Sequence, residues 1–245
     1  MKRCQTRKLW LIALAMVCLA GCGGQAQSSV PTEPASPSPT GTPAYPQASL
    51  PVPSFTSQEL EAMGIPGDLD EKSLRSIEYM YGNKKIDMIL SMPIQWVQIK
   101  PEGASENQCY FALRADEENQ TMFSISSHEE ALKDRENEET LLSYVEEKWE
   151  EYRSRQQTEG GNTIENVAAI QKIQVGRYIG GDIRFESIHS NGVRTINHFI
   201  IWATDQKVYW CTVTANPSYW VYTEDCMQTM LEGFVTFDDA MAMQE

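Results

Sequence analysis

Hydrophobic and polar residues alternate in short runs along most of the chain after residue 85, which is typical of half-buried strands. The runs with this pattern are 86–92, 95–99, 108–114, 121–126, 164–175, 182–189, 194–204 and 207–214. Before them, residues 57–63 have a helical pattern that ends at Gly64, and residues 73–81 are expected to form a turn or a second helix. The pattern as a whole predicts an antiparallel sheet.

Two longer helices are predicted, one in the middle of the chain and one near its end. In the first, apolar residues recur at spacings of three and four, and glutamates occupy the other side. The apolar positions are Leu141, Leu142, Val145, Trp149 and Tyr152, and the glutamates are Glu146, Glu147, Glu150 and Glu151. The second helix follows Asn216-Pro217-Ser218, and its apolar side is formed by Trp220, Met227, Met230, Leu231 and Phe234. These apolar sides predict helices that flank the sheet.

The segment Ser190-Asn191-Gly192-Val193 separates two β-rich runs, and Asn-Gly is the strongest short hairpin signal. If Asn191 and Gly192 are the central turn residues, the facing pairs are Ile183 with Ile200, Phe185 with His198, and Ser187 with Ile196. A second two-residue turn at Asp205-Gln206 would place Tyr209 opposite Trp202 and Cys211 opposite Ile200. One face of this meander would then form the core. Its residues are Ile183, Phe185, Ile196, Ile200, Trp202, Tyr209, Cys211 and Val213.

The start of the chain has the layout of a secretory signal. Four basic residues precede an apolar run from Leu9 to Leu19, and these about 11 residues are too few for the roughly 20 that span a bilayer. The run ends in Leu19-Ala20-Gly21-Cys22, which resembles the bacterial lipobox. The resemblance implies that Cys22 receives a lipid and becomes the first residue of the mature chain.

The residues after Cys22 are low in complexity, and eight of the 12 prolines of the chain lie before residue 58. Such a composition cannot bury enough apolar surface to fold. We therefore expect a lipoprotein signal peptide at 1–21, a disordered linker at 22–57 and a single globular domain at 58–245. Acyl chains on Cys22 would hold this domain outside the cytoplasm, anchored to the bacterial cell membrane.

The charge of the chain restricts its partners. It has 20 basic and 34 acidic residues, and the four basic residues at 2, 3, 7 and 8 would leave with the signal. The mature chain would then carry 16 basic against 34 acidic residues, a formal charge of −18. Nucleic acids and anionic membrane surfaces are poor partners for such a field. The acidic stretch 116–159 indicates a solvated face or, alternatively, a surface for a basic partner.

Three of the six cysteines, Cys109, Cys211 and Cys226, lie beyond the linker. This odd number allows at most one disulfide within the chain, and three buried thiols are the alternative. If a bond forms, we expect it between Cys211 and Cys226, because a strand and a helix joined by so short a link pack together. Cys109 would then be the unpaired thiol.

No sharp catalytic or metal-binding motif is present, and no cofactor or metal is predicted. His128-Glu129 begins like a zinc protease motif, but Leu132 stands where the second histidine is required. His189 and His198 would lie roughly 13 Å apart along a strand, which indicates surface or rim histidines instead of metal ligands. An aromatic cluster indicates core packing or an exposed platform for a glycan or a partner. Its members are Tyr209, Trp210, Tyr219, Trp220 and Tyr222.

The order of these elements over residues 85–236 resembles the PsbP-like family, which includes a photosystem II extrinsic subunit and many bacterial lipoproteins. The resemblance rests on a strand that ends at Met92-Pro93 before Gln95-Trp96, a mid-chain amphipathic helix, Gly180-Gly181 before long strands, and a closing helix. It implies an α+β fold in which an antiparallel β-sheet is flanked by helices as an α/β/α sandwich. It also implies a binding or assembly role, with no shared catalytic residues.

The sequence therefore predicts a non-enzymatic module, held at the membrane through the lipid on Cys22, that binds an envelope protein or a glycan. The alternative is a cell-envelope hydrolase that uses dispersed carboxylates. A transporter's solute-binding lipoprotein is disfavoured, because about 185 residues are few for two lobes around a cleft.

Lipidation can be tested with a labelled fatty acid. We expect the wild-type chain to take up the label, Cys22→Ala to lose it, and Cys18→Ala, which changes a cysteine of the apolar run, to keep it. The mature wild-type protein should also lack residues 1–21 by mass spectrometry. Equal labelling of the wild type and Cys22→Ala would refute the lipobox.

Overall fold

The computed structural model describes residues 55–62, 66–69, 74, 77–116, 118, 120–130 and 132–242. All of them belong to one compact unit that runs from Ala44 to Glu245. The predicted signal peptide, Cys22 and the linker up to residue 54 lie outside the described residues.

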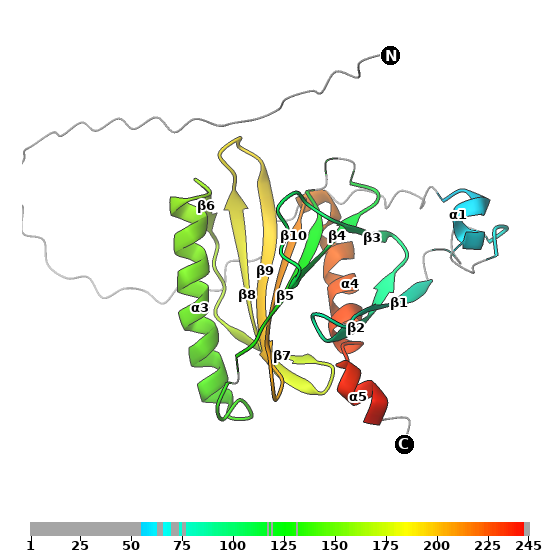
Figure 1. Ribbon diagram of the computed structural model, residues 1–245. Coiled ribbons are helices and arrows are strands. Elements are labelled where there is room, and N and C mark those ends of the chain that lie inside the picture. The colour runs from blue at the N-terminus through cyan, green and yellow to red at the C-terminus, as the bar shows by residue number, and fades with distance from the viewer. Residues whose placement is uncertain are drawn as a thin grey trace, which may run out of the picture. The chain divides into compact units, whose positions relative to one another are not determined.

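An eight-stranded antiparallel sheet forms the centre of this unit (Figure 1). Its strand order is β3-β4-β5-β10-β9-β8-β6, and β7 pairs with the other half of β8. The strands are β3 Trp96–Ile99, β4 Gln108–Leu113, β5 Met122–His128, β6 Thr163–Glu165, β7 Gln171–Val175, β8 Tyr178–Ile188, β9 Arg194–Ala203 and β10 Val208–Ala215. The sheet confirms the predicted antiparallel class and most of the predicted strands.

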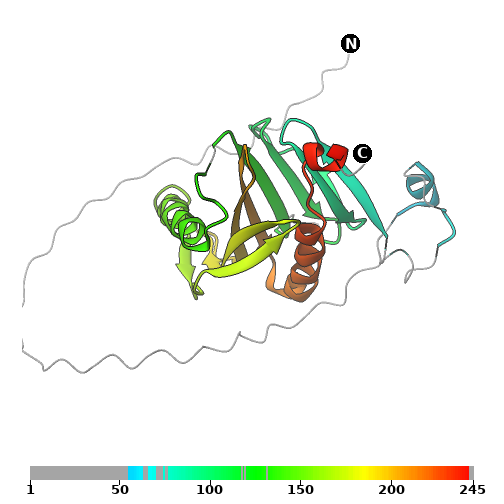
Figure 2. The same ribbon diagram turned by 90° about the horizontal axis from the view of Figure 1, so that it is seen from below.

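Helices cover both faces of this sheet (Figure 2). The long helix α3, Glu138–Thr158, lies on one face, and Asn137 caps its first turn by accepting a hydrogen bond from the Thr140 N–H. The opposite face packs against α4, Trp220–Glu232, which follows a short 3-10 helix, η1, at Pro217–Tyr219. A final short helix, α5, spans Phe237–Ala242.

A two-stranded sheet packs on the α4 side of the main sheet. It consists of β1, Glu78–Asn83, and β2, Met88–Pro93, which pair antiparallel. The side chains of β2 that face the core, such as Leu90 and Met92, share one apolar cluster with α4. The expectation of a turn or helix at 73–81 is therefore wrong for Glu78 to Tyr81, which are part of β1. The predicted strand 164–175 is also two strands, β6 and β7, paired with different parts of β8.

The first helix, α1 at Ser57–Ala62, begins with a capping box. The Thr56 N–H donates to Glu59 Oε2 at 2.8 Å, and the Glu59 N–H donates to Thr56 Oγ1 at 3.2 Å. Arg114, just after β4, donates to Glu59 Oε1 at 2.8 Å. The Thr56 N–H and Arg114 together lower the pKa of Glu59 to about 2, so its carboxylate stays charged at neutral pH. These contacts attach the helix that follows the predicted linker to the domain.

The hairpin between β8 and β9 has a longer loop than the sequence predicts. The His189 N–H donates to the Val193 carbonyl, and the Gly192 N–H donates to the His189 carbonyl, both at 2.8 Å. The loop therefore has three residues, from Ser190 to Gly192, instead of the predicted two. Gly192 has a φ of +83°, as the last residue of a three-residue hairpin loop requires.

The extra loop residue makes the predicted β8–β9 register wrong by one position. The observed facing pairs are Ile183 with Phe199, Phe185 with Asn197, and Ser187 with Thr195. A shift by one residue moves side chains to the other face of a sheet, so Phe185 packs under α3 while Trp202 packs against α4. The residues that were predicted to form one core face therefore lie on both faces of the sheet. The predicted β9–β10 register is confirmed, with Tyr209 opposite Trp202 and Cys211 opposite Ile200.

Gly176, in the turn between β7 and β8, is expected to tolerate substitution less well than Gly192. Both have a positive φ, but a Cβ at Gly176 would lie 2.1 Å from the Phe234 carbonyl oxygen, whereas a Cβ at Gly192 meets nothing within 4 Å. We expect Gly192→Ala to lower the free energy of unfolding by about 1 kcal/mol through backbone strain alone. Gly176→Ala should lower it by about 3 kcal/mol. Denaturant unfolding of both variants measures the difference, and equal losses would contradict the close approach.

Candidate functional site

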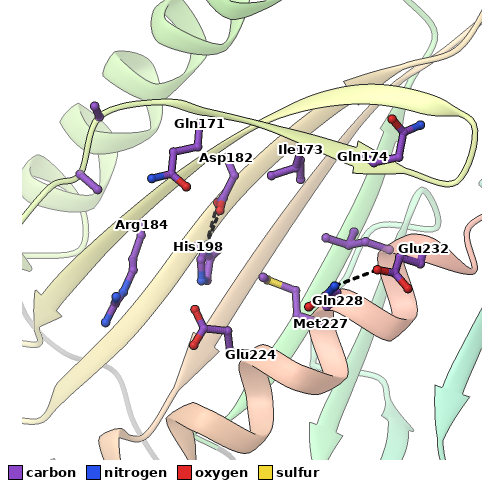
Figure 3. Close-up of a pocket in the computed structure, with 13 residues that line it drawn as sticks. Gln171, Ile173, Gln174, Asp182, Arg184, His198, Glu224, Met227, Gln228 and Glu232 are labelled. Carbon is purple, nitrogen blue, oxygen red and sulfur yellow. Dashed lines mark hydrogen bonds and ion pairs between the residues drawn. The ribbon is translucent and has the colours of Figure 1, made fainter. Parts of the chain in front are cut away.

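A cavity of about 540 Å³ lies between α4 and the sheet at β7, β8 and β9, and we call it the α4 groove (Figure 3). Part of its lining is apolar, namely Ala168, Ala169, Ile173, Met227 and Leu231. The rest is polar or charged, namely Gln171, Gln174, Asp182, Arg184, His198, Glu224, Gln228 and Glu232. The groove thus combines an apolar part with several groups that can form hydrogen bonds, which is the usual composition of a ligand site.

A buried hydrogen-bonded pair, His198 and Asp182, forms part of the groove lining. Nδ1 of His198 lies 2.8 Å from both carboxylate oxygens of Asp182, and the two residues are 4 % and 8 % exposed. The Trp220 ring stacks on the imidazole at 5.1 Å with an interplanar angle of 12°. Because Asp182 accepts the Nδ1–H, Nε2 is the nitrogen left for another group. Nε2 is buried, and no described residue gives it a hydrogen-bond partner.

The register of β8 and β9 explains why these side chains meet. Arg184 faces His198, and Asp182 faces Ile200, so Asp182 is the diagonal neighbour of His198 on the same face. This face packs against α4, and Trp220 is the first residue of that helix. The Arg184 guanidinium lies 4.7 Å from the centre of the Trp220 ring, a cation–π contact. The first turn of α4 therefore holds both the imidazole and the guanidinium in place.

Two glutamines of the groove leave their amide oxygens available as acceptors. The Gln228 side-chain amide donates to Glu232 Oε1 at 2.8 Å, and the Gln174 amide donates to the Gly176 carbonyl at 2.9 Å. Each bond uses one of the two amide N–H groups and leaves the amide oxygen as an acceptor. Glu224 forms no hydrogen bond or ion pair with another described residue. In the view of Figure 3, it lies on the side of His198 away from Asp182.

A second cavity, of about 510 Å³, lies on the α3 side of the sheet. It is lined by Ser126, His128, Tyr152, Arg155 and Trp210, among others. Ser126 Oγ lies 3.3 Å from His128 Nε2, but His128 is exposed and has no carboxylate bound to its other nitrogen among the described residues. Burial and then Arg155 lower the pKa of His128, and Glu130 opposes them. We take the α4 groove as the candidate site because only there is a histidine oriented by a buried carboxylate within the described part of the chain.

The structure corrects the interpretation of one histidine. His198 was expected to be a surface or rim residue, but it is buried and hydrogen-bonded to Asp182. His189 is half-buried, and its Nε2 lies 3.2 Å from Thr195 Oγ1. The described residues contain no group of three or more His, Cys, Asp or Glu side chains that could hold a metal ion.

The three cysteines beyond the linker are buried free thiols in the structure. Cys109, Cys211 and Cys226 all belong to the apolar cluster on the α4 side of the sheet. Burial raises the pKa of Cys211, so this thiol stays protonated and unreactive in the folded chain. A Cys211–Cys226 bond stays a prediction, which mass mapping without reductant can test.

The predicted aromatic cluster divides between core and surface. Tyr209 and Trp220 are buried, as core packing requires, whereas Trp210, Tyr219 and Tyr222 are half-buried.

Among the described residues, no helix has both the length and the apolar character needed to cross a membrane.

Neither a family model nor a curated protein matches the chain. Solved structures do match, and one is the solution structure of cyanobacterial PsbP (CyanoP) from Synechocystis sp. PCC 6803. It has a TM-score of 0.50 and 12 % identity, and the match covers 65 % of this chain and 92 % of that one. The chain therefore has a PsbP-like α+β fold.

Two further structures match with lower TM-scores. A crystal structure from Bacteroides thetaiotaomicron VPI-5482 gives 0.43 at 9 % identity, covering 64 % of this chain and 47 % of that one. A protein of unknown function from Pseudomonas aeruginosa gives 0.32 at 13 % identity, covering 62 % and 95 %.

Asp182→Asn is expected to destabilise the groove. The substitution removes the charge that orients the buried His198, so the free energy of unfolding should fall by about 2 kcal/mol. Asp238→Asn, which makes the same charge change at an exposed position of α5, should change it by less than about 0.5 kcal/mol. Chemical denaturation compares the two variants. Equal midpoints for Asp182→Asn and the wild type would contradict the role of the pair.

Proposed function

We propose that this chain is a lipid-anchored, extracytoplasmic binding module that takes a ligand, or a segment of an envelope partner, in the α4 groove without changing it chemically. The observation that carries the proposal is the buried Asp182–His198 pair in the groove lining, whose Nε2 has no partner among the described residues. A buried polar atom without a partner costs free energy that a bound group could recover. The PsbP-like fold supports a binding role, because it supplies the scaffold without requiring a catalytic centre.

The size and the composition of the groove support binding. Its volume of about 540 Å³ lies within the range of about 300 to 1,000 Å³ that is usual for ligand sites. Well-packed apolar residues are often as stabilising as a buried ion pair, or more so. The presence of Asp182 and His198 at this buried position is therefore better explained by recognition than by stability.

The anchor belongs to the same proposal. A lipid on Cys22 would hold the domain at the membrane, and the sequence between Cys22 and Phe55 can span at most on the order of 100 Å when fully extended. The formal charge of −18 after the signal keeps the domain away from anionic lipid. The partner would therefore be an envelope protein or a glycan within this reach.

A hydrolase is the second candidate, and the Asp182–His198 pair is the observation that favours it. An imidazole oriented by a carboxylate is the arrangement of a general base. Among the described residues that line the groove there is no Ser, Thr or Cys, so a water molecule would have to be the nucleophile. In that case the partner in the groove would be cleaved, and His198→Gln would abolish turnover while the folded chain still binds substrate.

A photo-crosslinking amino acid tests the binding role in intact cells that produce the full-length chain. We expect crosslinked adducts from position 228, which is exposed and lines the groove, and none from position 146, which is exposed on α3 across the sheet. Combining the label at 228 with Cys22→Ala should abolish the adducts if the anchor brings the partner within reach. Identical adducts from both positions, or no adduct from position 228, would refute the groove as the binding surface.

A further inference from the structure

We infer that the α4 groove binds a primary ammonium group carried on a short aliphatic chain. This inference rests on the proposed binding role of the groove and adds the chemical class of the ligand. It follows from the combination of acceptors, charge and apolar surface in the lining.

The groove lining offers several hydrogen-bond acceptors to a ligand. Gln174 and Gln228 each donate one of their two amide N–H groups to another atom of the chain, and their oxygens remain as acceptors for a ligand. In the neutral His198 ring, Asp182 accepts the Nδ1–H and Nε2 is an acceptor as well. An ammonium group has three donors and no acceptor, which complements this lining.

The charge of the groove favours a cation. Three carboxylates line it, those of Asp182, Glu224 and Glu232, against the one guanidinium of Arg184. Asp182 is bound to His198, and Arg184 lies over the Trp220 ring. A ligand carboxylate would meet this negative excess, whereas a ligand ammonium would be attracted to it.

Glu224 is the expected primary contact. It lies on α4, it is exposed, and no described residue forms an ion pair or a hydrogen bond with it. An ammonium that reached Glu224 would gain a charge-assisted hydrogen bond without breaking one inside the protein.

The apolar part of the lining accounts for the aliphatic chain. Ile173 of β7 and Met227 and Leu231 of α4 contribute apolar surface beside the carboxylates. Methylene groups placed against such surface gain transfer free energy when they are buried. A free diamine and the lysine side chain of a protein partner share this chemistry, and the experiment below separates them.

The binding test uses the full-length chain in a non-ionic detergent and three probes of equal length. We expect 1,5-diaminopentane to bind in isothermal titration calorimetry, and the diol 1,5-pentanediol and the dianion glutarate to give no signal. Binding of glutarate or of the diol as tightly as the diamine would overturn the ammonium specificity and leave the groove as a binding site. Absence of diamine binding would overturn the inference, while the crosslinking from position 228 tests the binding role separately.

Two measurements place the bound diamine in the groove. The chain has only three histidines, so labelling with ¹⁵N-histidine gives three imidazoles, and only the imidazole signal of His198 should shift on titration with the diamine.

Glu224→Gln should weaken binding of the diamine about tenfold, because it removes one charge-assisted bond. Glu146→Gln, the same substitution at an exposed position of α3 on the opposite face, should leave affinity unchanged. An equal loss in both variants would show that the overall field binds the diamine, and would overturn the inference.

A blocked lysine, Nα-acetyl-lysine amide, identifies the source of the ammonium. Displacement of the diamine by this compound would support the inference with a protein lysine as ligand. Failure to displace it, with diamine binding intact, would support the inference with a free amine as ligand.

Discussion

The fold depends on a sheet whose central strands carry buried apolar residues on both faces. Every residue of β9 except the first is buried, and β8 is nearly as enclosed. An antiparallel sheet often leaves one face to water, but this one requires a cover on each side. Helix α3 provides one cover through Leu141, Val145 and Trp149. Helix α4 and the β1–β2 sheet provide the other, and together they give the three-layer PsbP-like arrangement.

The sequence was sufficient to predict the class of the fold and most of its elements, because periodicity reports which residues are buried. It failed at β1, where only Tyr79 and Tyr81 alternate with exposed residues and no long apolar run marks the strand. It also failed at the β8–β9 register. The Asn191-Gly192 signal correctly located the turn, but it does not distinguish a two-residue loop from a three-residue loop that ends in glycine. Because of that single residue, Ile183 and Phe185 lie on the α3 face of the sheet instead of sharing a face with Ile200.

The same slip concealed the candidate site. In the predicted register, His198 faces Phe185 and appears as an isolated histidine at the rim of a core face. In the observed register, it faces Arg184 and contacts Asp182. A signal was present in the sequence, since Asp182 and Arg184 occupy alternate positions in a strand and must therefore share a face. The contribution of α4 could not be predicted, because it depends on how the helix crosses the sheet.

The two ends of α4 also determine the width of the groove. At its start, Trp220 stacks on His198 and lies under Arg184. At its end, the Leu231 carbonyl accepts a hydrogen bond from the Gly176 N–H at 2.8 Å, which ties the helix to the turn between β7 and β8. The helix is about 20 Å long at 1.5 Å per residue, so both attachments hold a rigid body against the sheet. A groove held in this way loses little conformational entropy when a ligand enters. The covering that the apolar sheet requires therefore also preorganises the polar groups for binding.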